Sequence, residues 1–222
     1  DWDGREVFIS FDGVDSFFYL WINGQYVGFS KNSRNTANFN ITPYLQKGKN
    51  TVAAEVYRSS DGSFLEAQDM FRLPGIFRTV ALYSVPKVHF RDLVATPDLD
   101  VTYTDGSLTV NAEIRNLDKK AIKDYKVYYS LYANKLYSDE NTLVDGFLSP
   151  VIDKIAPNET GSVQTVLKVK APNKWSAEFP YRYTLVAELK DKKNRTVEMV
   201  STIVGFRKVE IKDTPASEDE FG

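Results

Sequence analysis

The residues best suited to chemistry gather in one segment, residues 59–78, which reads SSDGSFLEAQDMFRLPGIFR. It brings together three carboxylates, an amide, two aromatic rings and an arginine: Asp61, Glu66, Asp69, Gln68, Phe64, Phe71 and Arg72. Carboxylates and amides can hydrogen-bond to several sugar hydroxyl groups, and an aromatic ring offers an apolar face to the C–H side of a sugar. The segment is also a long connection between two expected strands, and long ordered loops are often functional. These features make it a candidate sugar-binding loop.

The same segment admits plainer interpretations. An acidic loop with aromatics is commonly a solvated surface turn that one or two rings anchor. Asp61 precedes a glycine, so this pair can form an ordinary turn. Arg72 and Arg78 can each pair with an Asp or Glu across the loop. The residues alone leave these alternatives open.

Glu66 and Asp69 raise the question of a glycosidase acid and nucleophile. Retaining glycosidases hold two carboxyl groups about 5 Å apart on a rigid scaffold. Residues three positions apart in a loop can approach that distance. No feature of the sequence holds either one rigidly, so we do not assign them as a catalytic pair.

The elements that position this segment show the period-2 alternation of half-buried strands, and no long helical periodicity occurs. Alternation runs through residues 52–56 and 78–82 on either side of the segment. Residues 17–22 are apolar on both faces, as in a central strand. The pair Asn23-Gly24 that follows predicts a two-residue hairpin.

A second alternating series begins after Pro86 and covers residues 108–114, 127–131, 163–169 and 181–189. Turn signals separate its members, at Asp105-Gly106 and at residues 191–194. We therefore predict an all-β chain of two consecutive β-sandwiches. The expected domains are residues 1–86 and 87–211, followed by an acidic tail at 212–222.

Composition excludes several classes of function. The 222 residues carry a net charge of −2, with both signs interspersed, so no basic patch favours nucleic acid or an anionic membrane surface. The chain has no cysteine, which excludes disulfides and thiolate metal sites. No apolar run is long enough to predict a membrane span. Periplasm and bacterial cytoplasm both remain open, since no signal peptide is visible at Asp1 and the chain opens inside a strand-like pattern.

Three further residues, Trp21, Trp175 and His89, are of types that often occur in binding sites. Trp21 lies on the strand that is apolar on both faces, so we expect it in the core rather than on a sugar platform. Trp175 sits in a proline-flanked segment, and we expect it to pack against a neighbouring domain, with a core position as the alternative. His89 has no histidine or cysteine partner, so we expect a structural role rather than metal binding.

Two stretches of the first domain resemble the sugar-binding jelly-roll domain of family 2 β-galactosidases: WINGQYVG at residues 21–28 and SDGSFLEAQDMFRLPGIFR at residues 60–78. Related β-glucuronidases and β-mannosidases share the hairpin and the GIFR end, whereas the long stretch is more typical of β-galactosidases. In the second domain, PNKWSAEFPYRYTL (172–185) and VGFRKVEI (204–211) resemble the immunoglobulin-like domain that follows in the same enzymes, where the GFR strand leads into the catalytic barrel. The resemblance covers nearly the whole chain. It implies a partial galactose-binding-like jelly roll followed by an immunoglobulin-like sandwich.

The resemblance also implies roles for two carboxylates. The residue that matches Asp69 helps to bind a sodium ion and the galactosyl group in the family, and Gln68, Met70 and Arg72 flank it as the family's pattern requires. The residue that matches Asp61 lies close by and is the weaker assignment. Sodium and magnesium are implied only for the complete enzyme, and no cofactor is expected in the isolated chain.

The chain departs from the family at two loop positions. Ala67 stands where an acid is usual and Phe71 where tryptophan is usual, which affects the fine shape of the loop. The resemblance implies that the family's two catalytic glutamates lie on a TIM barrel beyond Gly222, and that the first jelly-roll strands precede Asp1. A jelly roll without those strands exposes unpaired edges, so we expect either contact with another copy of the chain or a poorly covered sheet face.

Three functions compete on these grounds. The leading hypothesis is the non-catalytic N-terminal portion of a β-galactosidase, in which Asp69 helps to shape the site and the two sandwiches orient the barrel of the same polypeptide. The alternatives are an autonomous carbohydrate-binding module and a structural two-sandwich spacer. Another family 2 glycosidase, a β-glucuronidase or β-mannosidase, is the alternative parent. Galactose binding by the isolated chain would distinguish the module from the fragment.

Overall fold

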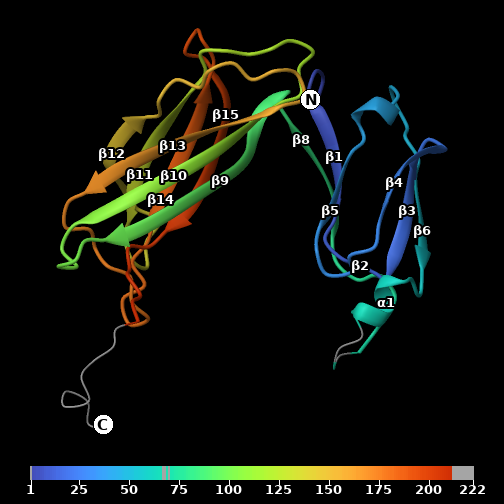
Figure 1. Ribbon diagram of the computed structural model, residues 1–222, viewed down its shortest axis with the longest axis horizontal. Helices are drawn as coiled ribbons and strands as arrows, with labels where there is room; N and C mark the ends of the chain where they lie inside the picture. The colour runs from blue at the N-terminus through green and yellow to red at the C-terminus, as the bar shows by residue number, and fades with distance from the viewer. Residues whose placement is uncertain (1, 67–68, 70, 212–222) are drawn as a thin grey trace. The chain divides into compact units, whose positions relative to one another are not determined.

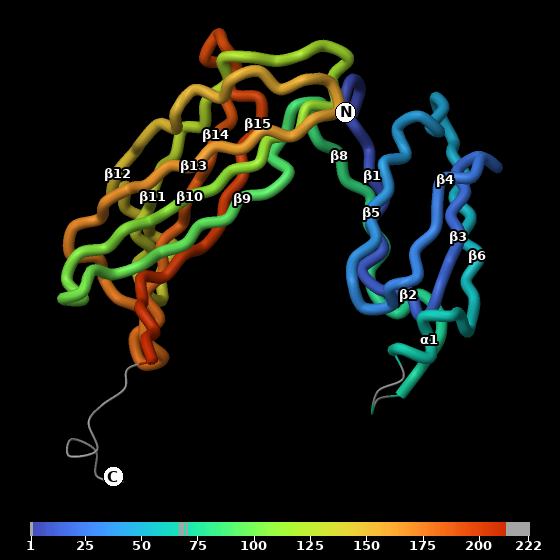
Figure 2. The backbone as a smooth tube through the Cα atoms, viewed as in Figure 1, coloured from blue at the N-terminus to red at the C-terminus, as the bar shows by residue number. Residues whose placement is uncertain are grey.

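The computed structural model describes residues 2–66, 69 and 71–211. The regular secondary structure of these residues is almost entirely β-strand (Figure 1; Figure 2), and the chain divides into two compact units, residues 1–87 and 88–222. None of the helices in the described part is long and apolar enough to span a membrane. The prediction of an all-β chain with two consecutive sandwiches is confirmed.

The first unit contains two three-stranded sheets, of order β5-β1-β8 and β4-β3-β6, and a short pairing of β2 with β7. All its pairings are antiparallel. Its elements are β1 (Glu6–Phe11), β2 (Val14–Asp15), β3 (Phe17–Ile22), β4 (Gln25–Ser30), β5 (Ala37–Asn40), the 3-10 helix η1 (Thr42–Tyr44), β6 (Val52–Tyr57), α1 (Gly62–Leu65), β7 (Gly75–Ile76) and β8 (Val80–Val85).

The core of the first unit lies between the two three-stranded sheets. Alternate residues of a strand project to opposite faces, and the inward set from β1 and β3 is buried: Val7, Ile9, Phe11, Phe18, Leu20 and Ile22. Strand β3 is central in its sheet, as predicted. The predicted hairpin joins β3 to β4, with Asn23 and Gly24 at φ of 51° and 79°. Positive φ at both positions suits the right-handed twist of the paired strands.

The sandwich of the first unit is open along its edge strands β6 and β8. Leu82 of β8 is in register with Ile9 of β1, and Val52 of β6 is in register with Ile22 of β3. Directly paired residues project to the same face, yet Ile9 and Ile22 are 3% and 0% exposed while Leu82 and Val52 are 54% and 46% exposed. Of the two expected outcomes, the structure therefore shows a poorly covered sheet face.

Trp21 does not lie in the core, so that prediction is wrong. The residues of β3 alternate between half-buried and buried positions, and Trp21 is on the half-buried outer face with Tyr19, 5.8 Å between ring centroids. Tyr26 of β4 packs beside both rings. A strand that is apolar on both faces therefore buries only one of them here, because the other face carries an aromatic cluster that is partly open to solvent.

The second unit is a sandwich of a three-stranded sheet, β13-β10-β9, and a four-stranded sheet, β12-β11-β14-β15 (Figure 1). Seven antiparallel strands in two layers are the arrangement of an immunoglobulin-like domain. The strands are β9 (Val88–Leu99), β10 (Gly106–Asn116), β11 (Lys126–Asn134), β12 (Asn141–Leu148), β13 (Thr160–Val169), β14 (Tyr183–Lys190) and β15 (Thr196–Val204).

The second core follows the predicted alternation closely. On β10, β11 and β14 the inward residues are fully buried: Leu108, Val110, Ala112, Ile114, Val127, Tyr129, Leu131, Leu185, Ala187 and Leu189. His89 is buried on β9, which agrees with a structural role. The GFR segment is not a strand as expected, because β15 ends at Val204 and residues 205–211 leave the sheet.

Candidate functional site

The candidate loop connects β6 to β8 at one end of the first unit (Figure 1). The sequence predicts at most a turn at Asp61-Gly62, but the structure forms the single-turn helix α1 there. Asp61 is its N-cap residue, and its side chain accepts a hydrogen bond from the Gly62 backbone N–H at 2.9 Å. Such a cap satisfies one of the amide groups that a helix start leaves unpaired. Further along, Gly75 and Ile76 pair with β2, which ties the returning half of the loop to the sandwich.

A cluster of serine hydroxyls holds the first half of the loop. Ser16, which lies between β2 and β3, contacts Ser60 Oγ at 2.7 Å and Ser63 Oγ at 2.8 Å. The Ser60 backbone N–H donates to Ser63 Oγ at 2.9 Å. Ser16 and Ser63 are buried, and a buried hydroxyl costs free energy unless it is hydrogen-bonded. The cluster therefore fixes α1 against the end of β3.

Asp61 forms an ion pair with Lys31. Lys31 Nζ lies 2.9 Å from Asp61 Oδ2, and both side chains are largely exposed. The hydrogen bond from Lys31 is the main cause that lowers the pKa of Asp61 below its usual value. An exposed pair of this kind adds little stability, so a sugar hydroxyl can compete with Lys31 for the carboxylate.

Glu66 is tied to Ser33 by both of its carboxylate oxygens. The Ser33 backbone N–H donates to Glu66 Oε1 at 3.2 Å, and Ser33 Oγ donates to Glu66 Oε2. Ser33 is buried, so Glu66 satisfies two donors that solvent cannot reach. This makes Glu66 an anchor of the loop rather than a carboxylate available to a substrate.

Asp61 and Glu66 share a surface hollow of about 360 Å³. Its other lining residues are Lys31, Asn32, Gly62 and Leu65. This volume is at the lower end of the range of small-molecule sites. The structure therefore brings Asp61 and Glu66 together in one hollow, and Asp69 is not among its lining residues.

Asp69 is exposed and makes no hydrogen bond or ion pair with another described residue. The loop around it also exposes large apolar side chains instead of anchoring them. Phe64 and Leu65 are each 87% exposed, and Phe71 and Leu73 are 93% and 74% exposed. Contiguous exposed apolar side chains mark contact surfaces. Phe64 and Phe71 therefore do not anchor the loop to the described residues around it.

The second half of the loop is anchored by Arg78 and Phe77. Arg78 donates to the backbone carbonyls of Arg34 at 3.1 Å and Asp12 at 3.4 Å, not to an Asp or Glu side chain. The guanidinium groups of Arg34 and Arg78 lie 5.0 Å and 5.3 Å from the Phe77 ring centroid. These cation–π contacts and the hydrogen bond from the Phe77 N–H to the Gly13 carbonyl hold the end of the loop.

Sequence reasoning missed the residues that hold the loop, namely Ser16, Ser33 and Lys31. They lie 30 or more positions from their partners, so no local spacing links them. The only local signal is Ser16, because a hydroxyl side chain stands directly before the apolar run of residues 17–22.

Among residues 2–66, 69 and 71–211, no group of three or more His, Cys, Asp or Glu side chains is placed to hold a metal ion. Asp69 offers one exposed carboxylate oxygen pair, which fits a single ligand position of a sodium site.

Both units match domains of one family. Residues 1–86 match the domain described as "Glycosyl hydrolases family 2, sugar binding domain", and residues 88–207 match "Glycosyl hydrolases family 2". A β-galactosidase of Priestia megaterium is 44% identical over 213 residues, which cover 96% of this chain and 20% of that protein. A β-galactosidase of Photobacterium profundum is 42% identical over 209 residues, which cover 92% of this chain and 19% of that protein. The chain therefore spans about a fifth of the length of these curated relatives.

Solved structures share the two-sandwich fold. A Bacteroides uniformis β-glucuronidase superposes with a TM-score of 0.81 at 22% identity, covering 93% of this chain and 25% of that one. A Parabacteroides merdae β-glucuronidase superposes with a TM-score of 0.77 at 21% identity, covering 94% of this chain and 26% of that one. Identity at this level shows the fold alone. The match of both units to domains of a single family, together with the curated relatives, shows that the chain belongs to glycosyl hydrolase family 2.

Proposed function

We propose that this chain is the non-catalytic N-terminal portion of a β-galactosidase that hydrolyses terminal, non-reducing β-D-galactose residues. The identity of 44% and 42% to two β-galactosidases, over more than nine tenths of the chain, supports this substrate class. The chain matches about a fifth of those proteins. The catalytic TIM barrel with its two glutamates accordingly lies in another part of the same polypeptide.

The proposed role of the chain rests on the exposed carboxylate of Asp69. The loop that bears Asp69 is anchored both before and after this residue. Glu66 holds the loop before Asp69, and Arg78 holds it afterwards. A carboxylate positioned in this way is available to accept hydrogen bonds from a galactosyl group or to contribute one ligand to a sodium ion. Such contacts orient a substrate while the two barrel glutamates break the bond.

Asp61 has a secondary role in this proposal. Its carboxylate lines the hollow of about 360 Å³ and is already paired with Lys31. A sugar hydroxyl that reaches Asp61 therefore replaces or shares the Lys31 contact. The expected loss on removing Asp61 is smaller than that on removing Asp69.

The test compares variants of the longer polypeptide that carries this chain and the barrel. Asp69→Ala should lower kcat/KM for a nitrophenyl β-galactoside by about tenfold or more, because one hydrogen bond to a charged group contributes about 1.5–3 kcal/mol. Asp153→Ala removes an exposed aspartate of the second unit and is the matched control. Equal activity of Asp69→Ala and Asp153→Ala would refute the role of Asp69.

Titration of galactose against the 222-residue chain addresses the remaining alternatives. We expect no millimolar binding, because the site is completed by the barrel. Millimolar or tighter binding that Asp69→Ala abolishes would instead identify an autonomous carbohydrate-binding module. An unaffected enzyme after deletion of the loop would identify a structural spacer.

A further inference from the structure

The segment that follows β15 is held at successive residues. Phe206 is fully buried and forms a parallel bridge with Lys174. The Trp175 backbone N–H donates to the Phe206 carbonyl at 2.9 Å. At Gly205 a Cβ atom would lie 3.1 Å from the Trp175 Cβ, so the two backbones approach closely. The Arg207 guanidinium then covers the Trp175 ring, 4.9 Å from its centroid.

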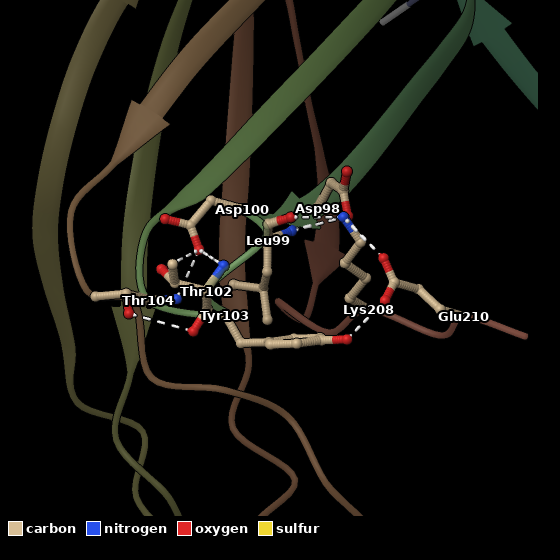
Figure 3. A network of polar contacts seen from close by, with 8 residues as sticks. All are labelled: Asp98, Leu99, Asp100, Thr102, Tyr103, Thr104, Lys208 and Glu210. Carbon is tan, nitrogen blue, oxygen red and sulfur yellow. Dashed lines mark hydrogen bonds and ion pairs between the residues drawn. The ribbon is translucent and has the colours of Figure 1, made fainter. Parts of the chain in front are cut away.

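Lys208 forms the centre of the next anchor (Figure 3). Its Nζ donates to the Leu99 carbonyl at 3.1 Å and lies 3.3 Å from a Glu210 oxygen and 3.9 Å from an Asp98 oxygen. An ammonium group has three donors, and three acceptors surround this one. The Lys208 side chain is only 19% exposed, so these contacts are less screened than those of an ordinary surface lysine.

Glu210 is held from the opposite side by Tyr103, whose hydroxyl donates to Glu210 Oε2 at 2.6 Å (Figure 3). Tyr103 lies in the turn between β9 and β10 with a φ of 56°, a conformation that non-glycine residues rarely adopt. Asp100 shapes this turn, because one of its oxygens accepts from Thr104 N–H at 2.8 Å and from the Thr102 hydroxyl at 2.9 Å. The hydrogen bond from Thr104 is the main cause that lowers the pKa of Asp100.

The apolar residues that alternate with Lys208 and Glu210 are exposed to solvent. Val209 and Ile211 are 80% and 99% exposed, whereas Lys208 and Glu210 contact the sandwich. The segment thus has a polar side fixed to the second unit and an apolar side open to solvent. A part of the protein that covers Val209 and Ile211 would remove their apolar surface from water, which is favourable.

We propose that Lys208, Glu210 and Tyr103, here called the exit clasp, are positioning residues that fix the direction in which the chain leaves the second sandwich. The occupant of the apolar side, Val209 and Ile211, is the part of the same polypeptide that follows. The curated relatives are about five times as long as this chain, and covalent linkage keeps the following part at high effective concentration next to this surface. The inference rests on the proposed function, because orienting a barrel matters only if a barrel follows.

The local test uses the 222-residue chain and measures NMR backbone order parameters at residues 208–211. Lys208→Met should lower them from the rigid range of about 0.85 toward about 0.6 or less, while the melting temperature of the second unit changes by less than about 2 °C. Tyr103→Phe, which removes only the hydroxyl, should act on residues 209–211. Lys208→Arg keeps the positive charge and should restore most of the order. Lys170→Met, at an exposed lysine that forms no ion pair with another described residue, should leave the order parameters of residues 208–211 unchanged.

The functional test uses the longer polypeptide. Lys208→Met should lower kcat for a β-galactoside by about tenfold with KM changed much less, because misplacement far from the chemistry chiefly affects alignment. Lys208→Arg should recover most of the loss. Unchanged order parameters in Lys208→Met would overturn the clasp itself. Reduced order with unchanged kcat would overturn its positioning role and leave the proposed function intact, whereas an inactive wild-type polypeptide would overturn the proposed function and this inference with it.

Discussion

At the residue scale, three carboxylates of one loop have three different environments. Glu66 satisfies the buried donors of Ser33, Asp61 pairs with Lys31 at the surface, and Asp69 is exposed without a partner among the described residues. Residue type and spacing identified all three as candidates. Their environments separate them into an anchor, an ion-paired carboxylate and an exposed carboxylate.

The different environments of Glu66 and Asp69 lead to a prediction about the stability of the first unit. Glu66→Ala leaves the Ser33 N–H and hydroxyl without their acceptor, and unsatisfied buried donors cost about 1–3 kcal/mol. We expect Glu66→Ala to lower the free energy of unfolding of the first unit by about that amount in urea titrations. Glu66→Gln keeps a carbonyl acceptor and should lose less. Asp69→Ala is the matched control in the same loop and should unfold like the wild type, so an equal loss in both variants would contradict the anchor role.

At the element scale, periodicity predicted the strands well, because alternation follows directly from the pleat of a strand. The residues of β10 and β14 are buried in the predicted alternation, and Asn23-Gly24 forms the predicted hairpin. Periodicity does not show which apolar faces of a strand other elements cover. Trp21 was therefore predicted in the core, although it lies on the half-buried outer face of β3. Periodicity also could not show the serine cluster around Ser16, since hydrogen bonds between distant segments leave no local pattern.

The turn between β14 and β15 supplies a pH-dependent prediction. Asp191 accepts from the backbone N–H of Arg195 at 3.0 Å and from its guanidinium at 2.6 Å, and also from Lys193 N–H. These bonds, the backbone bond from Arg195 foremost, lower the pKa of Asp191 from 3.8 to about 2. A carboxylate whose pKa is lower in the folded chain than in the unfolded chain stabilises the fold in full above its unfolded-state pKa. This stabilisation is lost as the pH falls through the folded-state pKa.

We therefore expect Asp191→Asn to melt at a lower temperature than the wild type at pH 7. The difference should persist down to about pH 4 and disappear between about pH 4 and pH 2. Thermal unfolding followed by circular dichroism at pH 7, 4 and 2 measures it. A difference that stays constant to pH 2 would show that the Asp191 carboxylate does not stabilise this turn.

The open edges of the first sandwich lead to a prediction about association. Leu82 and Val52 are exposed on faces that their strand partners bury, and unpaired edges of this kind recruit other strands. We expect the 222-residue chain to self-associate with rising concentration in sedimentation velocity measurements. Leu82→Lys should reduce this association, whereas Val151→Lys, at an exposed valine outside the strands of the other unit, should not. A monomer at all accessible concentrations would contradict the prediction.

At the scale of the whole molecule, the chain comprises two sandwiches, each with its own core. Their family is shown by the matches to both units, and their relatives extend over about five times the length of this chain. The candidate loop of the first unit and the exit segment of the second both present exposed apolar side chains beside fixed polar anchors. Both features suit a role in which the sandwiches position and complete a site that another part of the polypeptide supplies.

The most direct test measures hydrolysis of nitrophenyl β-galactoside, β-glucuronide and β-mannoside by the 222-residue chain and by the longer polypeptide that carries it. We expect no hydrolysis by the chain alone, because in the proposed function another part of the polypeptide supplies the glutamate pair that retaining chemistry requires. We expect the longer polypeptide to cleave the β-galactoside in preference to the other two substrates. Hydrolysis by the chain alone would contradict the non-catalytic role, and preference for the β-glucuronide or β-mannoside would contradict the proposed substrate.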